Sequence, residues 1–298
     1  MSAPVLLYCV GATKAGTSWF YRVLHDHPDC ALPPVKEAHY WDTFDEADRR
    51  HYASVFYREA ARLLDRAEGE TGERRALFEH RAADLRALLR VIEGERHDDS
   101  AYLRWLTARG EGKLLVADMT PAYSLQPVEI LRRMAALVPV TRFVYLVRDP
   151  LSRLWSHVRM IAQRRPGPAE ELGLRANAIL RRILEGGREP HVVMRGDYPA
   201  AHARLSEAVP AGGLRVEYCE RLFTEEGQRD MAHFLGIGYH PAASSRRVHE
   251  GTQVAMRDDL AVRAVRFLKG HYDWAARTLG PLPQAWQDNL ALASRNGA

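Results

Sequence analysis

Lysine is scarce in this chain of 298 residues. Among its 42 lysines and arginines, the lysines are Lys14, Lys36, Lys113 and Lys269, and the other 38 residues are arginines. A general preference for arginine accounts for the shortage, but a compact ammonium group and a planar guanidinium group bind anions differently. A lysine that such a chain retains is therefore a candidate for a position that needs a compact positive charge.

Cysteine is also rare, and its placement excludes two ways of stabilising a fold. Cys9, Cys30 and Cys219 are odd in number, lie far apart and form no CxxC pair. Neither a disulfide framework nor a cysteine-based zinc site is therefore expected. Because a reducing compartment suits free thiols, we expect a cytoplasmic protein.

Long apolar runs are missing as well. No stretch reaches the roughly 18 apolar residues that a membrane span needs, and residues 1–12 lack the positively charged start of a signal peptide. Hydrophobic residues make up 46% and charged residues 27% of the chain, which is ordinary for a folded globular protein. Because no apolar stretch is long enough, we expect no membrane span. The net charge is +4 and 38 acids are spread among the bases, so we also expect no nucleic-acid partner.

Short apolar segments bounded by turn residues recur along the chain and predict β-strands. We expect about five strands, at residues 5–10, 30–32, 114–117, 142–147 and 214–218. Because helical segments separate these nearly continuous apolar runs, the pattern indicates a parallel sheet with helices on both faces. The predicted fold class is α/β, with ligands at the carboxyl ends of the strands.

Two stretches without strand signals are rich in alanine, arginine, glutamate and leucine. We expect residues of about 45–109 and 163–198 to form helical insertions over the sheet. No internal repeat or low-complexity linker divides the chain, so we expect a single domain over residues 1–298.

A glycine-rich turn after the first predicted strand is the strongest functional signal. It comprises Gly11, Ala12, Thr13, Lys14, Ala15, Gly16, Thr17 and Ser18. The backbone N–H groups of such a turn, with a helix N-terminus behind them, bind phosphate-like anions. This predicts a fold like that of P-loop NTPases. The motif GxxxxGK[ST], however, has lysine directly after the second glycine, whereas here Thr17 follows Gly16 and the lysine is Lys14.

A second anion-binding signal follows the strand predicted at residues 142–147. Arg148 stands at the end of this strand, where its planar fork can clamp a phosphate group. Ser156 lies eight residues further on, two turns into a predicted helix, on a face that can point back to the same cleft.

Residues 10–19 (VGATKAGTSW) and 142–160 (RFVYLVRDPLSRLWSHVRM) resemble the donor-binding motifs of sulfotransferases that use 3′-phosphoadenosine 5′-phosphosulfate (PAPS). The resemblance is to the bacterial and heparan-type members of that family. It implies that Lys14 contacts the bridging oxygen of the phosphosulfate. It also implies that Arg148 and Ser156 bind the 3′-phosphate, so that PAPS is the donor and 3′-phosphoadenosine 5′-phosphate (PAP) the product.

The resemblance implies further donor contacts from Trp19, Tyr218, Gly251 and Thr252. Trp19 and Tyr218 match residues that reach the adenine in some members. In this family a segment near the C-terminus closes over PAPS, and residues 248–256, which contain Gly251 and Thr252, match it in position. The rival segment is 267–274, which has a lysine and a glycine but is predicted to be helical.

Residues 36–41 (KEAHYW) resemble a catalytic segment of the heparan-type and bacterial members. The resemblance implies that Glu37 is the general base for the acceptor hydroxyl, and that His39 is the rival base. It places Lys36, His39, Thr120 and Tyr123 at the acceptor. In the stretch that holds Thr120, the family's usual lysine is replaced by Met119.

These motifs predict transfer of a sulfuryl group from PAPS to a hydroxyl of a small molecule or glycan, without a metal site. Two alternatives stay open at this point. A P-loop kinase of a small alcohol would use the same kind of turn, and a catalytically degenerate nucleotide-binding protein would keep the turn without turnover. A homodimer is also possible.

Overall fold

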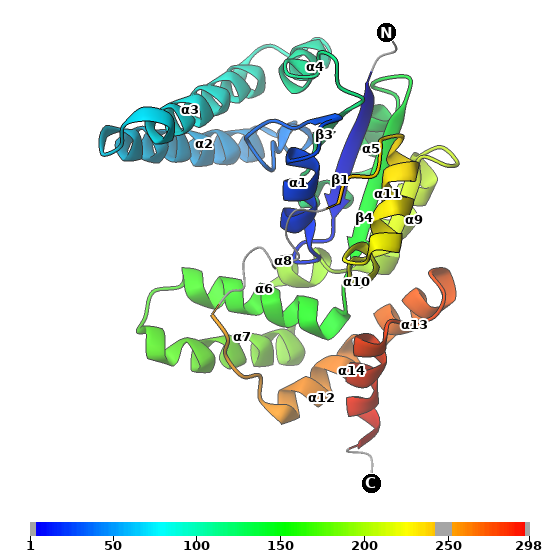
Figure 1. Cartoon of the computed structure of the whole chain (residues 1–298). Helices are drawn as coiled ribbons and strands as arrows, with labels where there is room; N and C mark the ends of the chain where they lie inside the picture. Colours follow the sequence, from blue (N-terminus) through cyan, green and yellow to red (C-terminus); the bar gives the residue numbers. More distant parts are fainter. Residues whose placement is uncertain (1–3, 242–251, 296–298) are drawn as a thin grey trace.

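The structure is a computed structural model, and it describes residues 4–241 and 252–295. At its centre lies a sheet of five parallel strands in the order β2-β3-β1-β4-β5 (Figure 1). The strands are β1 (Val5–Gly11), β2 (Cys30–Ala31), β3 (Leu115–Asp118), β4 (Thr141–Val147) and β5 (Leu214–Tyr218). The structure therefore confirms the predicted α/β class.

Strand β1 lies between β3 and β4, in the buried middle of the sheet. Leu7 pairs with Ala117 of β3 on one side and with Arg142 of β4 on the other. The side chains from Leu6 to Val10 are fully buried, as expected for a strand covered on both faces. The central position of β1 thus explains the apolar run that predicted it.

Helices fill the connections between the strands, as parallel pairing requires. The first are α1 (Thr17–His25), α2 (Glu46–Glu68), α3 (Gly72–Glu93), α4 (Ser100–Thr107) and α5 (Val128–Ala135). Between β4 and β5 lie α6 (Pro150–Arg164), α7 (Leu172–Gly186), α8 (Pro190–Met194) and α9 (Tyr198–Ala208). After β5 come α10 (Cys219–Leu222), α11 (Glu225–Leu235), α12 (Asp258–Phe267), α13 (Lys269–Thr278) and α14 (Gln284–Arg295). Short 3-10 helices are η1 (Tyr40–Asp42), η2 (Pro121–Leu125) and η3 (Ala169–Glu171).

The stretch between β2 and β3 forms a helical arm. Helices α2 and α3 run antiparallel and extend away from the sheet (Figure 1). Apolar side chains on both helices are buried, among them Phe56 and Leu63 of α2 and Leu85 and Ile92 of α3. Helix α4 then contacts both α3 and β3 and returns the chain to the sheet. None of the helices described is long and apolar enough to cross a bilayer.

The carboxyl ends of β1 and β4 lie side by side, next to α6 and α8 (Figure 1). The Ala12 N–H donates to the Leu146 carbonyl oxygen over 2.7 Å, which ties the turn after β1 to the last residues of β4. Helix α6 begins directly after β4, and Asp149 caps it by accepting from the Ser152 N–H over 2.7 Å. The two segments predicted to bind anions, the turn after β1 and the start of α6, therefore both begin at this edge of the sheet.

The C-terminal helices brace the start of α6. Asp149 accepts hydrogen bonds from the Tyr272 hydroxyl of α13 over 2.7 Å and from the Asn289 amide of α14 over 2.8 Å. The indole N–H of Trp286, also on α14, donates to Glu220 over 3.0 Å. The end of the chain thus holds the junction that presents Arg148.

Candidate active site

The turn after β1 depends on two glycines. Gly11 has a φ of +144°, and a Cβ there would lie 2.7 Å from the Tyr145 ring of β4. Gly16, with a φ of +90°, precedes the first turn of α1 and supplies no side-chain cap. Positive φ angles and close approach both favour glycine. The turn therefore packs tightly against β4 and leaves the first N–H groups of α1 without a side-chain acceptor.

Polar groups of this turn are available to a ligand. Thr13 Oγ1 is buried and has no hydrogen-bond partner among the described residues. Lys14 has a φ of +72°, which is unusual for a residue with a side chain. Thr17 is buried at the first position of α1, and Ser18 beside it is half-buried. An unsatisfied hydroxyl beside an uncapped helix N-terminus is a feature of anion-binding turns.

Positive charges gather around Lys14. Burial lowers the pKa of the Lys14 ammonium group, and four nearby cations lower it further: Arg148, Arg164, Arg159 and Lys36. The Lys14 nitrogen lies 4.0 Å from Met160 Sδ, and within residues 4–241 and 252–295 no carboxylate comes within ion-pair distance of it. A region of this kind attracts a ligand that brings its own negative charge.

Arg148 lies at the junction of β4 and α6, and its side chain contacts the turn after β1. Its Nη1 donates to the Lys14 carbonyl oxygen over 3.4 Å. The Tyr198 hydroxyl donates to the Arg148 carbonyl oxygen over 2.6 Å and accepts from the Arg148 N–H over 3.3 Å. Ser156 is half-buried, two turns into α6. The structure thus brings the two predicted anion-binding motifs together.

The segment between β2 and η1 carries the candidate base. Glu37 and His39 both have left-handed backbone conformations, with φ of +68° and +52°. Lys36 Nζ donates to Glu37 Oε1 over 2.6 Å, and His39 Nε2 lies 3.8 Å from Glu37 Oε2. On the other side of the imidazole ring, His39 Nδ1 lies 2.5 Å from Asp42 Oδ2. Asp42, His39 and Glu37 therefore form a chain of carboxylate, imidazole and carboxylate.

These contacts set the protonation states of the chain. Burial alone would raise the pKa of Glu37, but the hydrogen bond from Lys36 and the nearby charges of His39 and Lys36 lower it to about 2. Burial would likewise lower the pKa of His39, but the hydrogen bond to Asp42 and the negative charges of Asp42 and Glu37 raise it above its ordinary value. Glu37 is therefore a carboxylate near neutral pH, and the protonated form of His39 is favoured.

Thr120 and Tyr123, which the sequence places at the acceptor, are both fully buried. Both donate to Asp118 at the end of β3, Thr120 Oγ1 over 2.6 Å and the Tyr123 hydroxyl over 2.9 Å. The Tyr102 hydroxyl adds a third hydrogen bond to this carboxylate over 2.7 Å. The Tyr123 hydroxyl also accepts from the Trp41 N–H over 3.4 Å. These groups support the η1 segment and present no open surface to a ligand.

Two acidic residues that hold this region together were not predicted as site residues. They are Asp42, which contacts His39, and Asp118, which accepts the hydrogen bonds from Thr120 and Tyr123. A signal for Asp42 is present, because three residues separate it from His39 and a 3-10 turn brings such residues together. A signal for Asp118 is its place at the carboxyl end of a strand. Each residue also has a partner from another element: Gln126 donates to Asp42 over 2.6 Å, and the Tyr102 hydroxyl of α4 donates to Asp118.

The two residues expected near adenine lie in different surroundings. Trp19 is buried on α1 beside the turn. Its ring packs edge to face against the ring of Phe223, with the two ring centroids 4.8 Å apart. Tyr218 ends β5, but its hydroxyl donates to the carbonyl oxygens of Ala275 and Gly280, each over 3.3 Å. The structure keeps Trp19 next to the turn and directs the Tyr218 hydroxyl to the C-terminal helices.

The expected closing segment is described only in part. Gly251 lies outside the described residues. Thr252 lies against α6, where Arg159 donates to its carbonyl oxygen over 3.1 Å. In the rival segment, Lys269 is exposed and pairs with Asp273 over 2.6 Å. The first segment is thus the one whose described part reaches the cations around Lys14.

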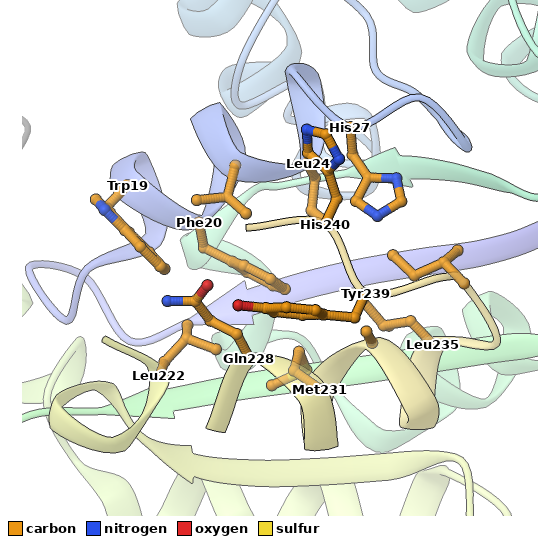
Figure 2. Close-up of a pocket in the computed structure, with 13 residues that line it drawn as sticks. Trp19, Phe20, Leu24, His27, Leu222, Gln228, Met231, Leu235, Tyr239 and His240 are labelled. Carbon is orange, nitrogen blue, oxygen red and sulfur yellow. The ribbon is translucent and has the colours of Figure 1, made fainter. Parts of the chain in front are cut away.

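A further pocket lies between α1 and α11, apart from the turn. In Figure 2, Phe20 of α1 and Met231 of α11 lie on opposite sides of Tyr239, and Trp19 stands at one end. Its lining is largely apolar and contains neither Lys14 nor the other cations around it. In the part of the chain that the structure describes, no three histidine, cysteine or acidic side chains are grouped so as to hold a metal ion.

Comparison with known proteins identifies the family of this chain. Residues 5–189, more than half of the chain, match the model described as Sulfotransferase family. The nodulation protein NoeE of Sinorhizobium fredii (strain NBRC 101917 / NGR234) is 24% identical, and the match covers 80% of this chain and 51% of NoeE. The chain thus spans about half the length of this curated relative.

Solved sulfotransferase structures share the fold. The crystal structure of a sulfotransferase from Alicyclobacillus acidocaldarius has a TM-score of 0.60 at 21% identity, covering 96% of this chain and 100% of that chain. The sulfotransferase domain of the Synechococcus PCC 7002 olefin synthase has a TM-score of 0.50 at 18% identity, covering 99% of this chain and 94% of that chain. The sulfotransferase domain from the curacin biosynthetic pathway has a TM-score of 0.50 at 16% identity, covering 99% and 98%. By its family model, which its fold supports, this chain belongs to the Sulfotransferase family.

Proposed function

We propose that this sulfotransferase moves the sulfuryl group of PAPS to a hydroxyl group of its acceptor. The observation that carries the proposal is the meeting of Lys14 and Arg148 at one turn. PAPS has a phosphosulfate on the 5′ side of its ribose and a phosphate on the 3′ side, so its charge calls for two cationic binding points. The two motifs supply them from adjacent strands.

The turn after β1 fits the phosphosulfate. The uncapped N-terminus of α1 offers N–H groups and a positive dipole end, and no described residue forms a hydrogen bond with the Thr13 hydroxyl. Lys14 would stabilise the negative charge that develops on the bridging oxygen as the sulfuryl group leaves. A compact ammonium group suits a single oxygen better than a planar guanidinium does. This role gives a physical reason for a lysine in a chain that otherwise uses arginine.

The start of α6 fits the 3′-phosphate. Arg148 offers a planar fork of N–H donors, and Ser156 would add a hydroxyl from the same helix. The backbone of Arg148 is fixed by the Tyr198 hydroxyl, so that binding would cost little additional ordering. Arg159, which contacts Thr252, would bring the closing segment to this end of the ligand.

Glu37 would take the proton of the acceptor hydroxyl. As the new bond between the acceptor oxygen and sulfur forms, the bond between sulfur and the bridging oxygen breaks, and the proton passes to the Glu37 carboxylate. Lys36 and His39 hold that carboxylate in its ionised form. His39, the rival base, is less suited, because Asp42 and Glu37 favour its protonated form. We therefore assign His39 the role of positioning Glu37.

Transfer of a radiolabelled sulfuryl group from PAPS tests the proposal. The acceptors are fractionated pools of small hydroxyl compounds and of oligosaccharides. Wild type should label at least one pool, and Lys14→Ala should lose about a hundredfold to a thousandfold in turnover. Lys269→Ala is the matched control, because that lysine is exposed and pairs with Asp273.

Three results would contradict the proposal. Near wild-type turnover in Lys14→Ala would remove the lysine from the chemistry. Transfer of phosphate from ATP that depends on Mg²⁺ would favour a small-alcohol kinase. Failure of the wild type to bind PAP would favour a degenerate nucleotide-binding protein.

A further inference from the structure

The backbone of the segment that carries the candidate base does not fix its side chains by itself. Residues 32–39 form neither helix nor strand. Glu37 and His39 have φ angles of +68° and +52°, in a region that residues with a side chain adopt at a cost. The orientation of the Glu37 carboxylate therefore depends on contacts made by side chains.

The contacts of His39 in its ring plane are unequal. Nδ1 lies 2.5 Å from Asp42 Oδ2, which is a hydrogen-bond distance, whereas Nε2 lies 3.8 Å from Glu37 Oε2, which is longer than a hydrogen bond. A single hydrogen bond at one edge of a ring leaves the opposite edge able to swing. The edge that faces Glu37 therefore needs a further contact to stay in place.

Tyr52 of α2 supplies this contact on one face of the His39 ring. The two ring centroids are 4.0 Å apart and the ring planes are inclined by 19°, so the rings are stacked. Stacked rings attract each other, and the attraction grows when one of them carries a positive charge. Asp42 and Glu37 favour the protonated form of His39, and burial raises the pKa of Tyr52 to about 12, so an imidazolium faces a neutral ring.

The helical arm that carries Tyr52 is anchored beside the same segment. Arg96, which follows α3, donates from Nη1 to the Thr43 carbonyl oxygen over 3.1 Å and from Nη2 to Thr43 Oγ1 over 2.7 Å. Thr43 directly follows η1, and Asp45 caps α2 by accepting from the Ala47 N–H over 2.8 Å. The two ends of the arm are thus joined where η1 ends. Tyr52 lies in the second turn of α2, close to this junction.

We propose that the helical arm takes part in catalysis through Tyr52, a positioning residue that holds His39 and, through it, the Glu37 carboxylate in the orientation for proton transfer. This inference rests on the proposed function, because it takes Glu37 as the base. A base must lie within hydrogen-bond reach of the proton that it takes, and a small displacement lowers the rate. Tyr52 should therefore affect turnover and leave donor binding unchanged.

Two substitutions at Tyr52 separate the effect of the ring from that of its hydroxyl. Turnover is measured with radiolabelled PAPS and the acceptor pool that the wild type labels. Tyr52→Leu removes the ring and should lower kcat about threefold to tenfold. Tyr52→Phe keeps the ring and should retain kcat within about twofold. Tyr57→Leu is the matched control and should keep the wild-type kcat, because Tyr57 lies on the same helix but is 53% exposed and donates to Glu93.

A second background shows whether Tyr52 acts through His39. In His39→Gln the ring that Tyr52 covers is gone, so adding Tyr52→Leu should change kcat by less than about twofold. A role of Tyr52 in the stability of the arm alone would lower kcat by the same factor in both backgrounds, and that result would overturn the inference. Equal losses in Tyr52→Phe and Tyr52→Leu would also overturn it, because the hydroxyl would then be the group that acts.

The affinity for PAP separates this inference from the proposed function. Both Tyr52 variants should bind PAP as tightly as wild type does, whereas about a tenfold loss of PAP affinity would assign Tyr52 to the donor side or to the fold and overturn the inference. If wild type transfers the label and Tyr52→Leu turns over as fast, the proposed function stands and this inference is wrong. If wild type labels no pool, the proposed function fails and this inference fails with it.

Discussion

Arg148 Nη1 lies 3.4 Å from the Lys14 carbonyl oxygen, although 134 residues separate the two in the chain. The contact joins the turn after β1 to the junction of β4 and α6. It exists because β1 and β4 are adjacent parallel strands whose carboxyl ends share one edge of the sheet. Two cationic residues on one rigid scaffold would complement the nucleotide that we propose as the donor, which has anionic groups on both sides of its ribose.

Replacing Arg148 should abolish recognition of the 3′-phosphate. AMP lacks this phosphate, so wild type should bind PAP about tenfold to a hundredfold more tightly than AMP, and Arg148→Ala should bring that ratio close to one. The measurement is calorimetric titration with each nucleotide. Arg50→Ala is the control, because Arg50 forms only an exposed pair with Glu46 on α2. An unchanged ratio in Arg148→Ala would show that another residue reads the 3′-phosphate.

Replacing Glu37 should remove the chemistry and leave donor binding intact. Glu37→Gln keeps the size of the side chain but cannot take a proton, so kcat should fall about a hundredfold to ten-thousandfold. PAP affinity should stay that of wild type. His39→Gln should lower kcat less, because His39 positions the carboxylate without accepting the proton. Kinetics with labelled PAPS measure both variants, and a larger loss in His39→Gln would make the histidine the base.

The raised pKa of His39 should appear in the pH dependence of stability. Because its pKa is higher in the folded protein than in the unfolded chain, His39 stabilises the fold fully below about pH 6.5, and the effect is lost as pH rises through the folded value. His39→Gln should therefore lower Tm more at about pH 6 than at about pH 9. His97→Gln, at an exposed histidine, is the control and should change Tm little. A larger effect of His39→Gln at the higher pH would contradict the assigned charge.

Replacing Gly11 should destabilise the fold. Its φ of +144° disfavours a side chain, and a Cβ would lie 2.7 Å from the Tyr145 ring. Gly11→Ala should lower the free energy of unfolding by about 1–3 kcal/mol. Gly270→Ala is the control, because α13 is helical there and nothing lies within 4 Å of the added Cβ. Denaturant unfolding measures both, and equal stabilities would show that the turn relaxes freely.

Much of the fold could be predicted from the sequence, because strands buried on both faces leave nearly continuous apolar runs. The run over residues 5–10 became β1 (Val5–Gly11), and residues 214–218 became β5 (Leu214–Tyr218). The order of the strands could not be predicted. It depends on how helices pack between distant segments, and local patterns do not encode this.

The site was predictable only where its groups follow one another in the chain. The turn around Lys14 and the segment of Glu37 are local motifs. Thr120 and Tyr123 share the Asp118 carboxylate with Tyr102, which comes from α4 and is not part of their local motif.

Titration of the wild-type protein with PAP in the presence of a metal chelator tests the central claim most directly. The claim is that one site, built by Lys14 and Arg148, binds a nucleotide with both 5′ and 3′ anionic groups. The predicted result is saturable binding of PAP that excess AMP displaces only weakly. Absence of PAP binding, or affinities for PAP and AMP that are equal, would contradict it.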